Sequence, residues 1–300
     1  MEVAAMITPA NLIAALLTLA PFLVAAFFPR WATGRVRSLP MWAQLLSPAA
    51  LCVPYLLVAI ASGIFRWGWL ALYALLPVAI ASLLWQAREI DRVDNGNRHG
   101  NWRDFLVLAV LGLAVDLRWF EGAWPAHLAI FNKMLLLDAG IYGFIALRQL
   151  EGTGFDLRLR LRDATIGLRE LAWYMPIGLA LGLSLGFLHL HAKWPGLMLI
   201  AGAWIFTFFF IAVPEELFFR GWLQNLLERR IGRAPALFLT AILFGLAHFN
   251  KRAVYFNWRY VLLAAAAGIF YGRAWRSQRR VGASAITHAS VDAIWSLWLR

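Results

Sequence analysis

Long runs of apolar residues, broken by short polar stretches, dominate the chain. Six runs are long enough to cross roughly 30 Å of hydrocarbon as helices, and they cover residues 7–28, 41–65, 69–85, 124–147, 173–190 and 196–213. Four shorter or weaker runs cover residues 105–115, 234–249, 260–275 and 283–299. This pattern predicts an all-α fold, a polytopic membrane helix bundle of about ten transmembrane helices.

The basic residues predict the orientation of these segments. If all ten cross, the loops on one side carry 19 Lys and Arg residues and those on the other side carry 7. Cytoplasmic loops collect Lys and Arg, so we expect the first set in the cytoplasm and both termini outside. If residues 105–115 did not cross the membrane, this asymmetry would be lost. We therefore count that segment as a crossing.

Composition supports a membrane protein and narrows its partners. The chain is 62% hydrophobic, with a mean hydropathy of +0.66 and 15% charged residues, which is too apolar for an average soluble domain. The net charge of +12 comes mostly from Arg in loops, so topology explains it better than a nucleic-acid partner does. The first run lacks the features of a signal peptide and is interpreted as a retained span. The arginine-rich composition hints at a prokaryotic cell (inner) membrane.

Cysteine content excludes several kinds of site. Cys52 is the only cysteine and lies in an apolar run. One thiol cannot form an internal disulfide, a multi-cysteine zinc site or a cysteine-ligated iron–sulfur cluster within one chain. We therefore interpret Cys52 as a packing residue.

Two segments near the middle of the chain carry structural signals. Residues 155–162 alternate apolar residues with Asp and Arg, which fits a short strand, an interfacial segment facing anionic headgroups, or a solvated basic loop. Gly178, Gly182 and Gly186 predict a smooth helix face that packs against a neighbour. We divide the chain into an N-terminal transmembrane region of unknown role, residues 1–170, and a motif-bearing region, residues 171–300.

Three charged residues follow nineteen uncharged residues at 195–213. They are Glu215, Glu216 and Arg220, and each costs roughly 2.5 to 3.5 kcal/mol within a membrane span. Glu216 and Arg220 are four residues apart, so on a helix they pair on one face. Glu215 points about 100° away. The Glu216–Arg220 pair is either a structural clamp or part of a catalytic site.

Further polar residues occur on two of the last three apolar segments, 234–249 and 283–299. Glu215 and His248 are almost equally distant in sequence from a turn near Ile231, so two antiparallel helices would place them at similar depth. His288 and Asp292 share a helix face through their four-residue spacing. These side chains are expected to converge inside the bundle, where helix bundles build their sites. Taken singly, each His also fits an interface residue.

Together these residues resemble the motifs of a known family. The motifs are Glu215-Glu216-x-x-x-Arg220, Phe244-x-x-x-His248 and His288-x-x-x-Asp292, in this order. They are similar to the three motifs of the CPBP (CAAX protease and bacteriocin-processing, Abi) family of intramembrane proteases, which includes the CAAX prenyl endopeptidases. The resemblance covers about residues 171–299. It implies a catalytic set of Glu215, Glu216, Arg220, His248, His288 and Asp292.

The resemblance also implies a mechanism. Glu215 would act as general base on a water that His248 helps to hold, and His288 would donate to the oxyanion. Asp292 stands where relatives vary between Asn and Asp, and an ionised carboxylate cannot donate a hydrogen bond. Glu215, His248 and His288 could instead hold a metal. The chain has no His-Glu-x-x-His zinc signature, so we favour catalysis without a cofactor and keep zinc as an alternative.

The expected function is therefore an intramembrane endopeptidase that cuts a membrane-associated peptide or protein. A non-enzymatic immunity or scaffolding protein on the same fold is the alternative, although a pure binder has no need of all three of Glu215, His248 and His288. A transporter would predict paired repeats, which the sequence lacks. The expected partners are the lipid bilayer and a peptide or protein substrate.

Overall fold

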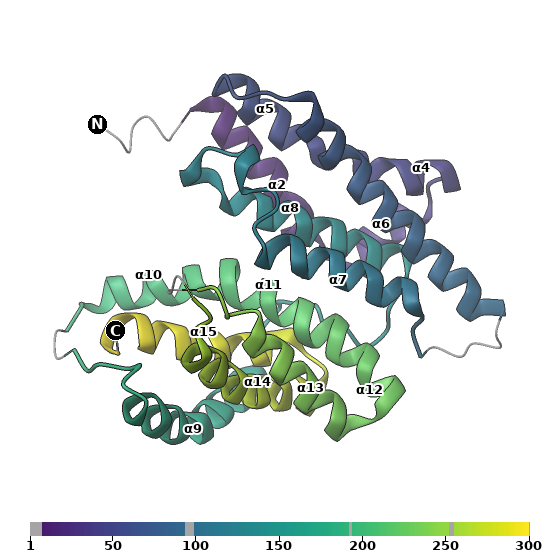
Figure 1. The fold of residues 1–300 in the computed structure, drawn as a ribbon. Coiled ribbons are helices and arrows are strands. Elements are labelled where there is room, and N and C mark those ends of the chain that lie inside the picture. Colours follow the sequence, from purple (N-terminus) through teal and green to yellow (C-terminus); the bar gives the residue numbers. More distant parts are fainter. Residues whose placement is uncertain (1–7, 94–98, 192–193, 252–254, 300) are drawn as a thin grey trace. The chain divides into compact units, whose positions relative to one another are not determined.

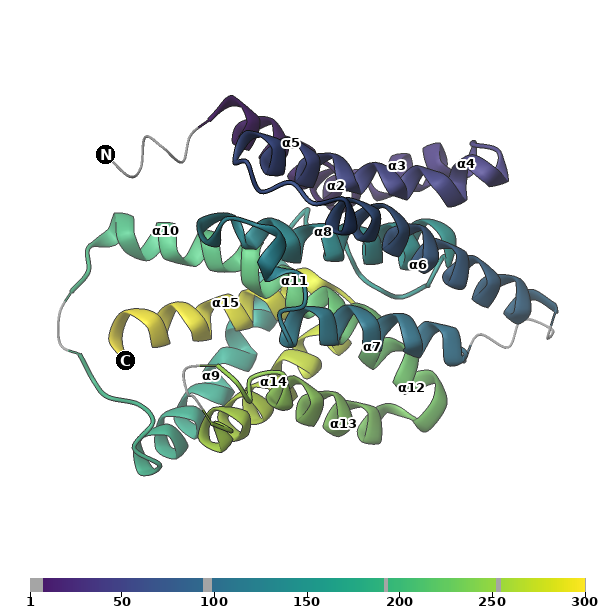
Figure 2. The same cartoon turned by 45° about the horizontal axis from the view of Figure 1, so that its top comes forward.

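The computed structural model describes residues 8–93, 99–191, 194–251 and 255–299, and Figures 1 and 2 show its helices. Within these ranges the regular secondary structure is entirely helical, which confirms the predicted all-α class. The helices divide into two compact units, Met1–Glu151 and Gly152–Arg300. Among the described residues, five helices are long and apolar enough to cross a membrane: Pro9–Phe27, Met41–Ala61, Trp67–Val93, Ala126–Leu147 and Leu197–Ile231. All ten predicted segments contain helix, while their number of crossings stays a prediction.

The first unit packs its helices around buried aromatic and charged side chains. Its aromatic core includes Tyr55 and Tyr73, whose rings stack 5.2 Å apart. Arg148 is buried and forms ion pairs with Asp91 and Asp104. The helices are α2 (Pro9–Phe27), α3 (Pro29–Arg37), α4 (Met41–Leu46), α5 (Val53–Ala61), α6 (Trp67–Val93), α7 (Trp102–Asp116) and α8 (Ile130–Ile141). Short 3₁₀ turns cover Ser47–Cys52, Glu121–Ala123 and Ala126–Leu128, and a π-helical stretch, Tyr142–Leu147, extends α8.

The second unit contains every motif-bearing segment. Its helices are α9 (Leu161–Ser184), α10 (Leu197–Thr207), α11 (Val213–Glu216), α12 (Asn225–Ile231), α13 (Arg233–Leu246), α14 (Trp258–Gln278) and α15 (Val281–Trp298). Two π-helical stretches, Phe208–Ala212 and Leu217–Gln224, join α10, α11 and α12 into one continuous helix. Helix α14 packs against α9, α13 and α15, and α15 also contacts α9, α10 and α11. Residues far apart in sequence thus meet around α14 and α15 (Figure 1).

Residues 155–160 form no strand. The prediction of a short strand, one of three alternatives for residues 155–162, was therefore wrong. Phe155 and Leu157 are buried, and the segment is held by side chains instead of by a strand ladder. Arg280 donates to Asp163 Oδ1 at 2.8 Å and to the carbonyl of Arg158 at 2.9 Å. The Arg160 N–H donates to Asp163 Oδ2 at 2.9 Å, which satisfies one of the free donors at the start of α9.

Helix α9 ends at Ser184, earlier than the apolar run that extends to residue 190. Gly186 adopts φ +60°, and the N–H groups of Phe187 and Leu188 donate to the Gly182 carbonyl at 2.9 and 3.1 Å. A residue with positive φ after a helix commonly ends it in this way. A Cβ on Gly182 would lie 2.3 Å from Leu188 Cδ1, and Gly186 lies beyond the helix. The expectation of a three-glycine face against a neighbouring helix was therefore wrong, because the chain reverses over these positions.

The boundary between the two compact units lies at a different position from the boundary that the sequence analysis placed before the first motif-bearing residues. Internal contacts separate Glu151 from Gly152, whereas the sequence-based division lies at residue 171. Helix α9 runs across residue 171, and its buried positions, Ile166, Gly167, Glu170 and Tyr174, repeat every three or four residues on both sides of it. The whole helix therefore belongs to the compact unit that holds the motifs. The separate roles assigned to residues 1–170 and 171–300 stay a prediction.

Candidate active site

The two adjacent glutamates lie between the π-helical stretches of the long helix Leu197–Ile231. Glu215 and Glu216 end the short α11, with π-helical backbone immediately before and after it. A π-helical turn inserts an extra residue and rotates the side chains that follow, and such turns occur frequently at functional sites. The long helix thus departs from regular α-geometry at the residues that carry charge.

Glu216 and Arg220 form the ion pair that their spacing predicted. Both side chains are fully buried, with Arg220 Nε 3.2 Å from Glu216 Oε2. The Arg220 guanidinium also donates through Nη2 to the Gly268 carbonyl at 2.9 Å and lies 4.6 Å from the ring centroid of Phe244. The guanidinium therefore links the long helix to α13 and α14.

His288 lies between three carboxylates. Its Nδ1–H donates to Glu216 Oε1 at 2.9 Å. Its other ring nitrogen, Nε2, lies 3.9 Å from Glu215 Oε2 and 3.5 Å from Asp292 Oδ2. The two neighbouring glutamates thus approach opposite nitrogens of one imidazole, and the predicted shared face of His288 and Asp292 is present on α15.

Glu215 and Glu216 differ in accessibility. The Glu216 side chain is fully buried between Arg220 and His288. The Glu215 side chain is 27% exposed, and Lys251 Nζ lies 3.8 Å from its Oε1. Glu215 is consequently the glutamate that a water or a substrate can approach.

His248 lies just beyond the end of α13 and is buried. Its Nδ1–H donates to the Phe244 carbonyl at 2.8 Å, which leaves Nε2 as an acceptor in the neutral ring. The ring lies against Phe244 and Tyr260, with centroid distances of 4.9 and 4.8 Å. The Phe-x-x-x-His motif thus orients its own histidine through a backbone hydrogen bond.

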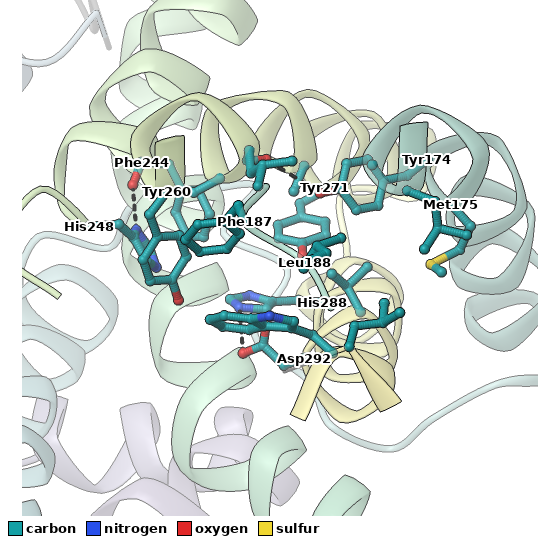
Figure 3. A pocket seen from close by; sticks show the side chains of 18 residues that line it. Tyr174, Met175, Phe187, Leu188, Phe244, His248, Tyr260, Tyr271, His288 and Asp292 are labelled. Atoms are coloured by element: carbon teal, nitrogen blue, oxygen red, sulfur yellow. Dashed lines mark hydrogen bonds and ion pairs between the residues drawn. The ribbon is translucent and has the colours of Figure 1, made fainter. Parts of the chain in front are cut away.

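His248, His288 and Asp292 line a cavity of about 70 Å³ (Figure 3). Side chains of α9, α14 and α15 complete its walls, and Phe187 and Leu188, which follow α9, lie at it as well. A water needs roughly 10 to 15 Å³ of such space, so several waters or a small side chain fit. All six predicted site residues therefore lie in or next to one site. Glu215 and Glu216 adjoin it through His288, and Arg220 contacts it only indirectly, by pairing with Glu216.

The residues proposed as alternative metal ligands do not form a complete ligand set. In the described ranges, no three His, Cys, Asp or Glu side chains come together in a geometry that could hold a metal ion. Glu215 and His288 approach each other at 3.9 Å, while His248 Nδ1 donates to the Phe244 carbonyl and leaves Nε2 open. Catalysis without a cofactor, with zinc as the alternative, stays a prediction.

Several residues of the site carried no recognisable signal in the sequence. The Tyr271 ring stacks on the His288 ring, 4.6 Å apart and nearly parallel at 13°. Lys251, next to Glu215, lies in a loop where a lysine is ordinary. Tyr174 comes from α9. One signal could have been used. Along one side of α14 lie Gly268, Tyr271 and Gly272, and this spacing could have predicted that this side of the helix packs against the motif-bearing helices.

The fold and the site define a polytopic membrane protein with a buried glutamate–histidine centre. Residues 195–294 match the family described as type II CAAX prenyl endopeptidase Rce1-like. The matched residues include all six predicted site residues, and the match confirms the recognised resemblance. Neither curated proteins nor solved structures gave a match. The family supports an intramembrane endopeptidase in general, acting on a peptide or protein substrate in an integral membrane setting.

Proposed function

We propose that this protein is an intramembrane endopeptidase in which Glu215 and His248 activate a water to hydrolyse a peptide bond of a membrane-associated substrate. The observation that carries the proposal is the placement of Glu215 and Glu216 at opposite nitrogens of His288, beside a cavity that His248 also lines. Peptide hydrolysis without a serine or cysteine nucleophile needs a base for the water, a group to position it and a donor for the oxyanion.

The different surroundings of the two glutamates support their different roles. Glu216 is held by Arg220 and His288 and is fully buried, so we assign it to orienting the imidazole. Glu215 is partly exposed and is assigned the role of general base. A carboxylate that receives a proton must be able to reach the water that loses it.

The proposed reaction proceeds through a tetrahedral intermediate. Glu215 takes a proton from a water that also donates to His248 Nε2, and the water oxygen attacks the carbonyl carbon of the substrate. His288 carries hydrogens on both nitrogens: Nδ1–H donates to Glu216, and Nε2–H donates to the developing oxyanion. Asp292 positions the ring from the same side as the substrate. The carbon–nitrogen bond then breaks, and the departing amine takes the proton from Glu215.

Replacement of the base tests this proposal directly. Glu215→Gln keeps the size of the side chain but cannot take a proton, so it should reduce kcat by at least the roughly 10²- to 10⁴-fold that general-base catalysis contributes. His248→Ala should lose a comparable factor, and the double variant should be little worse than either single variant, because residues acting on one water are non-additive. Cleavage of a single-span peptide in proteoliposomes measures this, with crosslinking of the same peptide to show retained binding.

Glu121→Gln provides the matched control, because this carboxylate lies in the first unit and pairs only loosely with Arg118, at 3.8 Å. It should cleave like the wild type. Full activity of Glu215→Gln would exclude the base assignment. Peptide crosslinking without cleavage by the wild type would favour the alternative, a non-enzymatic immunity or scaffolding protein.

Removal of metal ions by a chelator distinguishes catalysis without a metal from catalysis with zinc. The proposed mechanism uses no metal, so activity should survive dialysis against a strong chelator. Activity that is lost on chelation and restored by zinc would retain the protease but assign Glu215, His248 and His288 to metal binding, where a metal would supply an activated water.

The cell membrane of a prokaryote is the proposed location, supported by the arginine-rich composition alone. In that setting we expect the substrate to be a secreted peptide or a C-terminal sorting tail. Comparing membrane proteins of a deletion strain with those of the parent strain identifies the substrate as the protein that accumulates uncut. Complementation by Glu215→Gln should fail to restore its cleavage.

A further inference from the structure

The first compact unit contains a second cavity, formed without any residue of the proposed active site. Its volume is about 560 Å³, which lies within the roughly 300 to 1,000 Å³ of small-molecule sites. Two connections of this unit supply its walls, the turn between α5 and α6 and the segment between α7 and α8: residues 62–66, Gly122, Trp124, Pro125 and His127. The predicted topology places both connections outside the cytoplasm. The cavity is large enough for a small organic ligand.

Buried aromatic side chains connect the two walls of this cavity. The Tyr55 hydroxyl accepts from the Arg66 N–H at 3.0 Å and donates to the Arg66 carbonyl at 3.2 Å. Tyr55 stacks on Tyr73, whose hydroxyl accepts from Trp124 Nε1–H at 2.7 Å. Trp124 is itself part of the opposite wall. Both walls are thus anchored to one aromatic cluster, so the shape of the cavity is largely formed before a ligand binds.

The polar side chains of this cavity suit an anionic ligand. Arg66 supplies a guanidinium from one wall and His127 an imidazole from the other, and no Asp or Glu is among the described residues that line it. Both side chains are exposed. Within the part of the chain that the structure describes, neither forms an ion pair or a side-chain hydrogen bond. A guanidinium without a carboxylate partner offers its donors to an anion that enters the cavity.

We propose that this cavity binds the phosphate group of a small organic molecule, with Arg66 and His127 as the donors. The oxygens of a phosphate point in several directions, so one phosphate can accept from donors on two walls, whereas the acceptors of a carboxylate lie in one plane. The planar donors of an arginine match phosphate oxygens, and an imidazole has at least one N–H donor. The apolar lining, which includes Ile64, Phe65 and Trp124, contacts the organic part. The phosphate belongs to a lipid headgroup or to a free phosphorylated compound.

Calorimetric titration of the full-length protein in a maltoside detergent tests this site. The probes are inorganic phosphate, glycerol 3-phosphate and dihexanoyl phosphatidylglycerol, with acetate as the carboxylate control. Glycerol 3-phosphate or the lipid should bind more tightly than inorganic phosphate, because only an organic part reaches the apolar lining. Arg66→Gln and His127→Ala should each weaken binding of the tighter probe about 10- to 100-fold, the usual contribution of a hydrogen bond to a charged group.

Arg118→Gln is the matched control, because this arginine lies in the same connection between α7 and α8 but does not line the cavity. It should bind the probes like the wild type. Arg66→Lys keeps the charge but loses the planar arrangement of donors, so it should weaken binding less than Arg66→Gln does. Thermal unfolding without ligand shows whether each variant is folded, and Arg66→Lys replaces Arg66→Gln if the latter is not.

The probes also identify the source of the phosphate. Binding of the lipid without glycerol 3-phosphate supports a headgroup site, and binding of glycerol 3-phosphate supports a site for a free phosphorylated compound. Binding of inorganic phosphate alone, of acetate as tightly as the phosphate probes, or of no probe would overturn the proposal. Unchanged affinity in both cavity variants, or an equal loss in Arg118→Gln, would overturn it as well. The experiment measures binding and not cleavage, so its failure leaves the proposed protease activity standing.

Discussion

Arg220 is a buried cation that holds together residues from four helices. It pairs with Glu216, donates to the Gly268 carbonyl and lies over Phe244, while Glu216 in turn binds His288. A guanidinium can make these contacts simultaneously because its donors point in fixed directions within one plane. Arg220 thus supports the histidine without touching the substrate in the proposed reaction.

Arg220→Ala should therefore damage folding as well as activity. The substitution leaves Glu216 as an uncompensated buried charge, and removal of one partner of a buried ion pair costs about 3 to 5 kcal/mol. Arg220→Lys keeps the charge but loses the planar arrangement of donors, so its loss of thermal stability should lie between those of the wild type and Arg220→Ala. Thermal unfolding in detergent measures both, with Arg259→Ala, an exposed arginine, as control. An unchanged melting temperature for Arg220→Ala would contradict the clamp role.

At the scale of elements, glycines decide how closely α13 and α14 approach. A Cβ on Gly245 would lie 2.5 Å from the Val261 carbonyl oxygen, and one on Gly272 would lie 2.4 Å from Leu237 Cδ1. The first contact is with backbone, which cannot rotate aside. The close approach brings the Gly268 carbonyl within reach of Arg220 and sets Tyr271 against His288.

Gly245→Ala should therefore force α13 and α14 apart. Overpacking of this kind costs about 1 to 3 kcal/mol, and we expect a lower melting temperature together with reduced cleavage, because His248 follows directly after α13. Gly202→Ala, in open space on α10, should keep or slightly raise stability. Equal stability of the two variants would show that the helices tolerate a wider spacing.

At the scale of the whole molecule, the number and direction of the crossings can be tested. Ten crossings with both termini outside follow from the 19 to 7 distribution of basic residues. In a Cys52→Ala background, single cysteines at positions 2 and 300 should react with a membrane-impermeant maleimide added to intact cells. A cysteine at Arg162 should react only after permeabilisation. Cytoplasmic labelling of either terminus would refute the topology.

Much of the architecture was predictable from local pattern. The apolar runs located the helices, because length and hydrophobicity alone determine which segments can lie in hydrocarbon. The spacing of Glu216 and Arg220 gave their pairing, and the turn at Gly232, where φ is +83°, lies next to the predicted Ile231. The ends were less well predicted: α9 begins twelve residues before the run starting at 173 and ends at Ser184. Helix ends depend on capping contacts with remote residues, here Arg280 with Asp163.

The sequence by itself determined the helical membrane class and the charged pair, because these depend on composition or on spacing within one segment, and the set of six candidate residues, because it follows from the resemblance of three short motifs to a known family. Only the tertiary structure decided that Glu215 and Glu216 approach opposite nitrogens of His288, that Tyr271 stacks on the same ring, and that α9 closes the cavity. These relations join residues from different helices. Their geometry depends on how closely and at what rotation the helices pack, which no local pattern encodes.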